Sequence, residues 1–444
     1  MITKLKNIVT QEGFVKYFKN TSWLLLEKII RMGLGLFVSV WITRYLGKEQ
    51  FGTFSYVQSL VGIFSIFTTL GLDSLLIREF VDKKIDEAKL FGTVFILRLL
   101  GTIFVYVALF LAFNYVIADR SVEIFVYVMA LTLFFQIFQI FDFYFKSRVI
   151  TKYFVIASTI AFVISIALRI YFIQSQKPLI YFLWAIVVEA FVLALFLIYF
   201  YIRKGETPIK RFIFDKHIAT KLLGESWPWI ISAFVLVLYL KMDQLMLKHF
   251  LGDAQVGIYA AASKLSEIWA FVPTIVCSSL FPAIINAKSV SEEKYYNRLQ
   301  ALYDLMVWGA ILLAIPITLL ADNITNMLYG QEYVDSSFVL KVHIWTGIFT
   351  FFGSAWFNWV VIEKYQKTGL YMSILSLIAN FVMNYFVIPI YGAKGAVITT
   401  LITYSLSHIF FALFFENQKK AVKMFWNTFN LKRIYYEIRS SLRS

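Results

Sequence analysis

Long apolar runs separated by short polar turns constrain this chain more than any other feature. A helix needs about 20 mainly apolar residues to cross the hydrocarbon core of a bilayer. By that measure the sequence contains twelve such runs, and breakers such as Lys177-Pro178 and Pro389-Ile390-Tyr391-Gly392 lie in the turns between them. The predicted helices cover 22–45, 51–78, 90–116, 122–146, 149–173, 179–202, 219–247, 254–285, 297–320, 337–362, 367–388 and 393–416.

The composition agrees with a membrane protein. Hydrophobic residues make up 60% of the chain and charged residues 16%, with a mean hydropathy of +0.72, whereas soluble proteins carry about 25% charged and 45–50% apolar residues. The net charge of +15 is spread over loops, and we therefore interpret it as a topology signal rather than a nucleic-acid surface. Lys and Arg concentrate in the segments that lie inside if both termini are cytoplasmic. We predict an all-α polytopic protein of the plasma membrane.

An internal repeat divides the chain in two. The segments 46–54 (LGKEQFGTF) and 251–259 (LGDAQVGIY) share Leu, Gly, Gln, Gly and an aromatic residue at identical spacing, with an offset of 205 positions between Gly47 and Gly252. Internal repeats in membrane proteins are typical of transporters, in which one repeat rocks against the other. Because six predicted helices precede the polar segment 204–218 and six follow it, we expect the repeats to be parallel.

This division predicts two six-helix lobes joined by a cytoplasmic linker. A cytoplasmic N-terminal tail precedes the first lobe, and a basic cytoplasmic tail follows the second. In chain order the tail, N-lobe, linker, C-lobe and basic tail cover 1–21, 22–203, 204–218, 219–416 and 417–444.

Charged side chains inside the predicted helices are the main functional signal, because charges at membrane depth are costly and tend to face an interior cavity. Glu27, Lys28 and Arg31 share one face of the first helix. Either Glu27 and Arg31 pair at i,i+4 while Lys28 reaches the surface, or the group forms a cationic stripe on a cavity wall with Glu27 tuning its charge.

Two arginines in the N-lobe allow different interpretations. Arg98 has no acidic residue within a turn of its own helix, so it either pairs with Asp73 or Asp142 of a neighbouring helix or faces a cavity. Arg169 lies near the outer end of its helix, where we expect its long side chain to reach the membrane surface. Glu189 lies near mid-span without a local base. It is either protonated and hydrogen-bonded or the coupling residue of a proton-driven carrier.

The C-lobe carries its own charged positions. Lys264 and Glu267 share a face of the eighth predicted helix and either neutralise each other or serve separately, Lys264 binding an anion and Glu267 exchanging a proton. Asp243 shares a polar face with Ser232 and Tyr239 that points to a cavity or a neighbouring helix. We group Glu27, Glu189, Asp243 and Glu267 as ion-coupling or charge-balancing residues.

No catalytic or metal-binding pattern is present in the sequence. It contains neither a Walker-type glycine loop nor a nucleophile elbow, and its polar loops are too short for an ATPase or glycosyltransferase domain. His343 and His408 stand alone, and the single Cys277 has no partner for a disulfide. We expect a non-enzymatic transporter without a bound metal or cofactor, coupled to H⁺, to Na⁺ or to no ion.

Several motifs are spread over essentially the whole chain: 44–52 (RYLGKEQFG), 70–73 (LGLD), Arg78-Glu79, Asp243 with 251–261, Phe281-Pro282 and 391–396 (YGAKGA). In their order and spacing they resemble the flippases that export O-antigen and capsule repeat units, which belong to the multidrug/oligosaccharidyl-lipid/polysaccharide exporter (MOP) superfamily.

The resemblance implies two six-helix bundles arranged as a V around a central cavity. It also implies a polyprenyl-diphosphate-linked oligosaccharide as cargo, moved from the cytoplasmic to the outer leaflet by alternating access, with membrane lipids and possible polymerase and assembly proteins as partners. The diphosphate is anionic, and cations at membrane depth suit it. The predicted anion-binding residues are Lys28, Arg31, Arg98 and Lys264.

Two departures refine this interpretation. Lipid II flippases of the superfamily typically have fourteen helices, whereas twelve are predicted here. The charged positions also do not repeat between the halves, since Leu236 corresponds to Arg31 and Ser59 to Lys264 at the offset of 205. We therefore expect an electrostatically asymmetric cavity, suited to an elongated cargo with one anionic end.

Three rival functions stay open at this point. A cation-coupled multidrug exporter of the same fold would favour a carboxylate-rich cavity. A non-transporting scaffold of an envelope-assembly complex would not need charges at membrane depth. A membrane glycosyltransferase or polymerase would need a sizeable outer loop, and the predicted outer loops are short.

Overall fold

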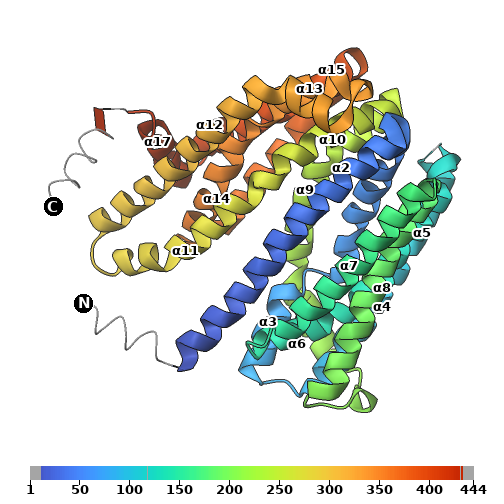
Figure 1. The fold of residues 1–444 in the computed structure, drawn as a ribbon. Helices are drawn as coiled ribbons and strands as arrows, with labels where there is room; N and C mark the ends of the chain where they lie inside the picture. Colours follow the sequence, from blue (N-terminus) through green and yellow to red (C-terminus); the bar gives the residue numbers. More distant parts are fainter. Residues whose placement is uncertain (1–11, 118, 431, 434–444) are drawn as a thin grey trace. The chain divides into compact units, whose positions relative to one another are not determined.

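The computed structural model describes residues 12–117, 119–430 and 432–433, and these residues form helices joined by short turns, without a strand among them (Figure 1). They divide into two compact units. The first takes in the chain up to Leu46 together with Thr53–Val237, and the second takes in Gly47–Gly52 and the chain from Leu238. The predicted tails 1–21 and 417–444 lie partly outside the described residues.

The helices follow one another with few residues between them. Those of the first unit are α2 (Glu12–Thr69, apart from its residues 47–52), α3 (Asp73–Asp82), α4 (Glu87–Tyr115), α5 (Glu123–Gln136), α6 (Ile140–Ser147), α7 (Lys152–Gln174), α8 (Leu179–Lys204) and the first part of α9 (Lys216–Leu251). The second unit continues with the rest of α9, α10 (Asp253–Glu267), α11 (Phe271–Lys288), α12 (Glu292–Tyr329), α13 (Val334–His343), α14 (Thr346–Ile362), α15 (Gln366–Ser405), α16 (Phe411–Leu413) and α17 (Lys419–Asn427).

The predicted number of membrane crossings agrees with these helices. Among the described residues, nine segments are long and apolar enough to cross a bilayer, and the bent pair α13–α14 makes a tenth. Two of the ten contain α2 and α15, whose 58 and 40 residues exceed one crossing of about 20 residues. Each is interrupted by a glycine with non-helical backbone angles, Gly47 in α2 and Gly392 in α15. Dividing both segments there gives twelve spans.

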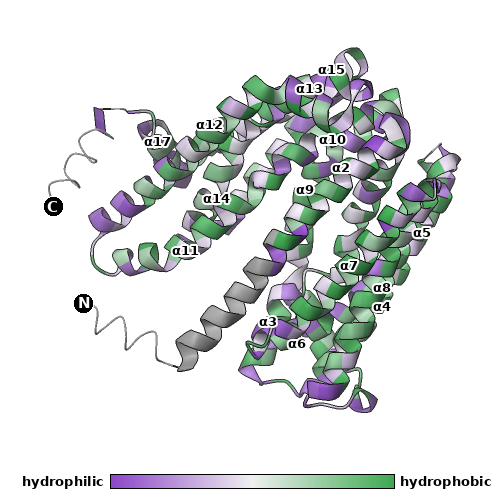
Figure 2. Cartoon of the chain, viewed as in Figure 1, coloured by the Kyte–Doolittle hydropathy of each residue, from purple (hydrophilic) through white to green (hydrophobic). Residues whose placement is uncertain are grey.

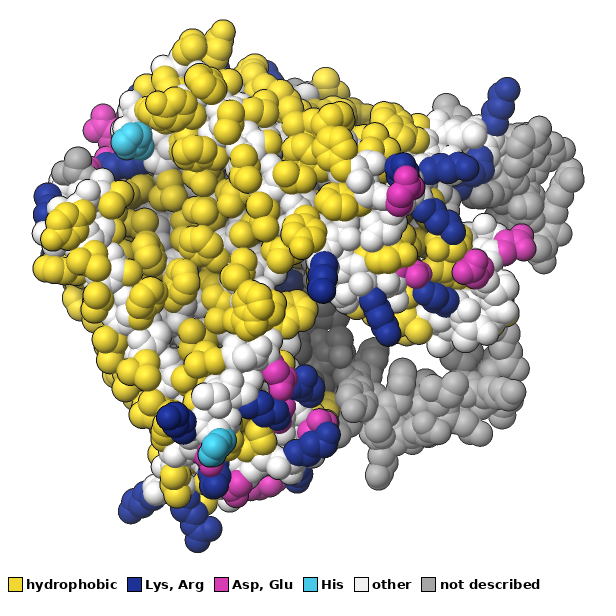
Figure 3. Space-filling view, turned by 180° about the vertical axis from the view of Figure 1, so that it is seen from behind, with side chains coloured by type: hydrophobic (Ala, Val, Ile, Leu, Met, Phe, Trp, Pro, Cys, Tyr) yellow, Lys and Arg dark blue, Asp and Glu magenta, His cyan; other side chains and the backbone are white. Residues whose placement is uncertain are grey.

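The surface has the character of a protein that faces lipid. Hydrophobic residues run along the middle of α4, α5 and α8, and hydrophilic ones gather at turns such as that between α3 and α4 (Figure 2). From the opposite side, hydrophobic side chains cover a broad area with Lys and Arg at its margins (Figure 3). Leu100, Phe104, Leu319 and Phe386 are among the exposed large hydrophobic residues. Such an exposed apolar area is stable in lipid and not in water.

Four predicted helices are divided where the sequence suggested continuity. One of them, 122–146, is divided by a short 3₁₀ turn at Ile137–Gln139 between α5 and α6. The predicted helix 51–78 is wrong as one element, because α2 ends at Thr69 and α3 begins at Asp73 after Leu70 and Gly71 adopt positive φ. The predicted helix 337–362 bends by 43° between α13 and α14. The predicted helix 254–285 is divided by a short 3₁₀ turn at Ile268–Ala270. Apolar pattern alone does not reveal such breaks, because every residue in them remains compatible with a membrane span.

The two copies of the repeat motif pack against each other in a reciprocal way. A Cβ atom on Gly52 would collide with the carbonyl of Asp253, and one on Gly257 would collide with the carbonyl of Lys48. Lys48 and Asp253 are themselves equivalent at the offset of 205. In each motif, therefore, a glycine contacts the backbone carbonyl of the equivalent residue in the other motif. Small residues allow membrane helices this close approach. The repeat in the sequence is therefore also a symmetric contact in the fold.

The segment 204–218 is packed onto the first unit rather than extended. The ring of Phe212 stacks on Phe91 of α4, with centroids 4.8 Å apart and an interplanar angle of 5°. The amide of Ile213 donates to the carbonyl of Ala88 at 3.2 Å. Gly92 is needed beneath this segment, because a Cβ atom there would overlap the backbone of Ile213. These contacts hold the start of α9 against α4.

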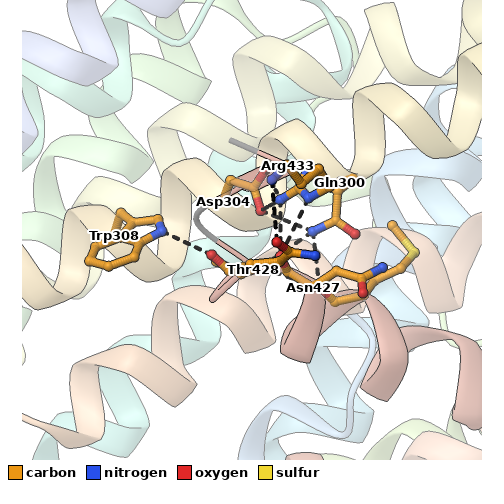
Figure 4. Close-up of polar contacts among 8 residues, drawn as sticks. Gln300, Asp304, Trp308, Asn427, Thr428 and Arg433 are labelled. Atoms are coloured by element: carbon orange, nitrogen blue, oxygen red, sulfur yellow. Dashed lines mark hydrogen bonds and ion pairs between the residues drawn. The ribbon is translucent and has the colours of Figure 1, made fainter. Parts of the chain in front are cut away.

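The C-terminal helix α17 is clamped to α12 by polar contacts (Figure 4). Arg433 donates to both carboxylate oxygens of Asp304 at 2.7 Å. Gln300 donates to the carbonyl of Met424 at 2.9 Å, and the indole of Trp308 donates to the carbonyl of Thr428 at 3.1 Å. Side chains of α12 thus donate to one carbonyl near the end of α17 and to one just after it, and Asp304 holds Arg433.

Candidate functional site

Four charged side chains meet inside the first unit. Arg31 of α2 donates from Nε to Glu27 at 2.9 Å and from Nη1 to Glu189 of α8 at 2.7 Å. Arg169 of α7 approaches the second oxygen of Glu189 at 3.4 Å. Three helices thus contribute to one chain of alternating charges.

One face of α7 supports this cluster. Ser158 accepts a hydrogen bond from Arg31 at its carbonyl at 3.1 Å and donates from Oγ to Glu27 at 3.1 Å. One turn further, the ring of Phe162 lies 4.6 Å from the guanidinium carbon of Arg31, at a distance suited to a cation–π interaction. Arg169 lies on the same face, eleven residues after Ser158, because eleven residues are close to three helical turns.

The cluster is neutral overall, and Arg31 is its most accessible member. Two carboxylates balance two guanidinium groups, which is the condition under which charges are tolerated at membrane depth. The side chain of Arg31 is 36% exposed, against 13% for Glu27, 17% for Glu189 and 16% for Arg169. Lys28 is exposed beside them. An incoming anion would therefore meet Arg31 and Lys28 first.

Arg98 occupies a different place in the first unit. Its side chain is fully buried, donates to Asp73 at 2.7 Å and to the carbonyl of Gln136 at 3.4 Å, and lies over the ring of Phe143. Of the two predicted partners, Asp73 is confirmed, while Asp142 pairs with Lys146. Asp73 is the first residue of α3, so this pair fixes the start of α3 against α4.

A second polar cluster lies inside the second unit, around Asp243 of α9. The Asp243 carboxylate is buried and accepts hydrogen bonds from Tyr259 of α10 and from Asn384 and Thr400 of α15. Asn384 is in turn bonded to Asn380 at 3.1 Å and to Thr399. No cation pairs with Asp243 among the described residues; neutral donors alone hold its charge.

Asp243 lies in the wall of a cavity of about 360 Å³ whose lining residues all belong to the second unit. Helices α9, α10, α12, α13, α14 and α15 all contribute to its lining. Polar and charged groups on this wall are Lys241, Asp243, Tyr259, Ser266, Glu267, His343, Thr346, Thr350, Asn380 and Thr400. His343 is bonded through Nδ1 to Ser266 at 2.5 Å.

Lys264 of α10 lies near the first copy of the repeat motif. Its side chain is exposed, and its ammonium nitrogen lies 6.0 Å from the ring centroid of Phe51 in the repeat motif. Glu267 is exposed on the cavity wall and forms no ion pair among the described residues. Which of the two predicted roles Lys264 and Glu267 have, mutual neutralisation or separate anion and proton binding, stays a prediction.

The predicted site residues thus separate into three groups. Glu27, Arg31 and Glu189 come together, with Lys28 at their edge, whereas Arg98 makes its contacts elsewhere in the first unit. Asp243 and Glu267 share the cavity of the second unit. The expectation that Arg169 reaches the surface is wrong, because Glu189 draws it inward.

Sequence reasoning missed Ser158, Tyr259, Thr399 and Thr400, which carry little signal alone. The i,i+4 spacing of Asn380 and Asn384 places both on one face of a helix, but the contact of Asn384 with Asp243 spans 141 positions. Within the described part of the chain, no group of three or more His, Cys, Asp or Glu side chains is placed to hold a metal ion.

The fold defines a class of protein. The chain resembles the solved lipid II flippase MurJ with a TM-score of 0.67 at 14% identity, covering 95% of this chain and 93% of that one. It resembles an inward-facing MATE multidrug transporter of the MOP superfamily with a TM-score of 0.66 at 14% identity, covering 90% and 96%. At such identities the likeness shows the fold, which is the all-α polytopic fold of the MOP superfamily.

The sequence then places the chain within that class. Residues 17–288 match the family described as polysaccharide biosynthesis protein, and this protein belongs to that family. Two relatives come from Haloferax volcanii. One is a probable low-salt glycan biosynthesis flippase, Agl15, 22% identical over 204 residues; the match covers 44% of this chain and 41% of that protein. The other is a probable flippase, AglR, 25% identical over 179 residues; the match covers 38% and 37%. The chain thus spans about two fifths of the relatives' length.

Proposed function

We propose that this protein is a flippase that moves a polyprenyl-diphosphate-linked oligosaccharide repeat unit from the cytoplasmic to the outer leaflet of the plasma membrane. It works by alternating access, serves surface polysaccharide biosynthesis and catalyses no reaction itself. Family membership supports a role with glycans, and the names of the two Haloferax volcanii relatives support flipping. The observation that carries the proposal is the partly exposed Arg31 held at membrane depth between two carboxylates.

Arg31 suits the diphosphate of such a cargo. A guanidinium group binds phosphate oxygens through two parallel hydrogen bonds. In this structure the Nε and Nη1 groups of Arg31 donate to Glu27 and Glu189 instead. An arriving diphosphate exchanges with these carboxylates. Glu189 then keeps Arg169, and Glu27 keeps the hydroxyl of Ser158. Arg31 can therefore release both carboxylates while each of them keeps another hydrogen-bond or ion-pair partner.

The same exchange supplies a route for proton coupling. Glu27 and Glu189 compete with the diphosphate for Arg31, because all three are anionic. Protonation of Glu189 removes one competitor and favours cargo binding, and loss of that proton favours cargo release.

Lys28 and Lys264 are further exposed cations for the headgroup. Arg98 as a cargo ligand stays a prediction, and in this structure it is buried against Asp73.

Asp243 offers a second place for a coupling ion. Its carboxylate, the amide oxygen of Asn384 and the hydroxyls of Thr399 and Thr400 form an oxygen-rich group, and hard cations prefer oxygen ligands. Under this proposal a Na⁺ ion or a proton binds there during the transport cycle. Replacing Asp243 by Asn abolishes any dependence of transport on that ion.

The cellular setting follows from the same proposal. Both termini are cytoplasmic, so the cargo is collected where it is assembled. The protein works with membrane lipids and with a polysaccharide polymerase and other assembly proteins that use the delivered repeat unit.

The test is transbilayer movement of a fluorescent polyprenyl-diphosphate oligosaccharide in proteoliposomes, with accumulation of a cationic dye measured in the same vesicles. We expect glycolipid movement that falls at least about tenfold in Arg31→Ala, the loss expected when one charged hydrogen-bonding group is removed. Lys264→Ala should reduce movement less, because that side chain is exposed.

Other outcomes would change the assignment. Dye transport without glycolipid movement would make the protein a multidrug exporter. Movement of neither would favour the scaffold role. Normal glycolipid movement in both variants at equal expression would remove the anion-binding role of these two residues.

A further inference from the structure

Two opposite charges line the cavity of the second unit without neutralising each other. Lys241 of α9 and Glu267 of α10 both contribute to its wall. Neither forms an ion pair or a hydrogen bond with another described residue, whereas both oxygens of Asp243 are occupied by donors. A charged side chain in a membrane span without a partner is costly unless a ligand or water satisfies it.

Aromatic rings form another part of the same wall. The rings of Tyr239 and Tyr404 lie 5.3 Å apart between centroids at an angle of 34°, and Trp269 lies on the turn between α10 and α11. The hydroxyl of Tyr404 and the indole N–H of Trp269 have no hydrogen-bond partner in the described part of the chain. The wall therefore combines flat apolar faces with unused donors and a carboxylate acceptor.

We infer that this cavity binds a sugar ring of the glycan headgroup, an assignment that rests on the proposed flippase function. Each sugar hydroxyl both donates and accepts hydrogen bonds, so Glu267 and Lys241 can share one ring between them. The C–H face of a sugar ring is apolar and packs on aromatic rings such as Tyr404. The volume of about 360 Å³ lies within the range of about 300–1,000 Å³ for small-molecule sites.

The charge balance distinguishes this ligand from others. Lys241 and Glu267 are one base and one acid that no other described side chain engages, whereas neutral donors already occupy both oxygens of Asp243. A cationic drug would favour a surplus of accessible carboxylates, and a free anion would favour a surplus of bases. A neutral polyhydroxylated ring needs both kinds of group at once. The first unit then serves the diphosphate through Arg31, and the second unit serves the sugar.

The experiment compares two cargoes in proteoliposomes that contain the full chain. One cargo is the polyprenyl-diphosphate oligosaccharide pool extracted from the source cells, and the other is bare undecaprenyl diphosphate. Movement is followed by the exposure of each lipid to membrane-impermeant reagents. The variants are Glu267→Gln and Tyr404→Phe, which preserve shape, and Arg31→Gln. The matched control is Glu416→Gln, since Glu416 lies on the surface, 87% exposed.

We expect Glu267→Gln to slow the glycan-bearing lipid about tenfold, as for loss of one charged hydrogen bond, and Tyr404→Phe to slow it less. Movement of bare undecaprenyl diphosphate should stay within about twofold of the unmodified protein in both variants. Arg31→Gln should slow both cargoes, and Glu416→Gln neither. Size-exclusion profiles establish that each variant is folded.

Two results would overturn the sugar site while leaving the flippase function intact. One is equal slowing of both cargoes by Glu267→Gln, and the other is an unchanged rate for the glycan-bearing lipid in both cavity variants. Failure of the unmodified protein to move either lipid would overturn the flippase function, and the sugar site with it.

Discussion

Arg31 has several hydrogen-bond partners inside the protein, and each of them can be replaced by a ligand. Its guanidinium is shared by Glu27, Glu189 and the carbonyl of Ser158, and packs on Phe162. Each partner is replaceable, because Glu27 and Glu189 have second partners of their own. The arrangement keeps a charge stable at membrane depth and still leaves it able to exchange partners.

Glu189→Gln tests the proton route at the residue scale. The variant retains the shape and one hydrogen-bond acceptor but binds no proton, so transport should lose most of its dependence on pH. The measurement is the initial rate of glycolipid movement as the pH is varied. An unchanged pH profile would show that Glu189 is not the coupling residue.

Gly257→Ala tests the reciprocal contact of the repeat motifs. The added methyl group would overlap the carbonyl of Lys48, and forced overpacking costs about 1–3 kcal/mol. We expect a lower melting temperature in detergent. Gly309→Ala is the matched control, because nothing lies within 4 Å of the Cβ position on Gly309 in α12, and alanine there should be neutral or stabilising. Equal melting temperatures for the two variants would contradict the close contact.

At the scale of elements, the start of α9 depends on Asp215. Its Oδ1 accepts hydrogen bonds from the amides of His217 at 3.0 Å and Ile218 at 3.3 Å, which caps the helix. Lys89 of α4 donates to Oδ2 at 3.0 Å. The hydrogen bond from Lys89, followed by those from the backbone amides, lowers the pKa of the Asp215 carboxyl below its ordinary value.

The lowered pKa predicts a pH-dependent effect of Asp215→Ala. A carboxyl group with a lowered folded-state pKa stabilises the fold above its unfolded pKa of about 3.9, and this contribution is lost as the pH falls through the folded value. The variant should therefore melt at a lower temperature than the unmodified protein at pH 7, with a smaller difference near pH 3. Asp215→Asn keeps the cap but not the charge and should show the intermediate loss. A difference that does not change with pH would assign the effect to capping alone.

At the scale of the whole molecule, the even number of spans fixes which loops share a side of the membrane. Twelve spans place the segment 204–218 and the C-terminal tail together, and the turn before α5 on the other side. Single cysteines at Lys216, Lys432 and Arg120, introduced in a Cys277→Ser background, test this arrangement. We expect an impermeant maleimide applied outside intact cells to label only Arg120→Cys. Labelling of Lys216→Cys under these conditions would contradict the predicted topology.

Much of the fold could be predicted from the sequence, and less of the site. The apolar runs identified the spans, and the offset of 205 between Gly47 and Gly252 identified the repeat. The breaks at Leu70–Gly71 and after His343 could not be predicted, because they change backbone angles without changing the hydrophobic pattern. The local pair of Glu27 and Arg31 was one of the predicted alternatives, since i,i+4 neighbours on a helix meet.

The sequence by itself determined that this protein is a helical membrane protein built from two similar halves. Bilayer thickness dictates the length of the apolar runs. These runs and the internal repeat are both properties of consecutive residues, so they can be recognised without knowing how the helices pack. Only the tertiary structure decided which charges meet. Glu189 reaches Arg31 across 158 positions, and Asp243 reaches Thr400 across 157. Such pairings depend on how helices pack against one another, and a charged residue in a membrane span must find whatever partner that packing brings within reach.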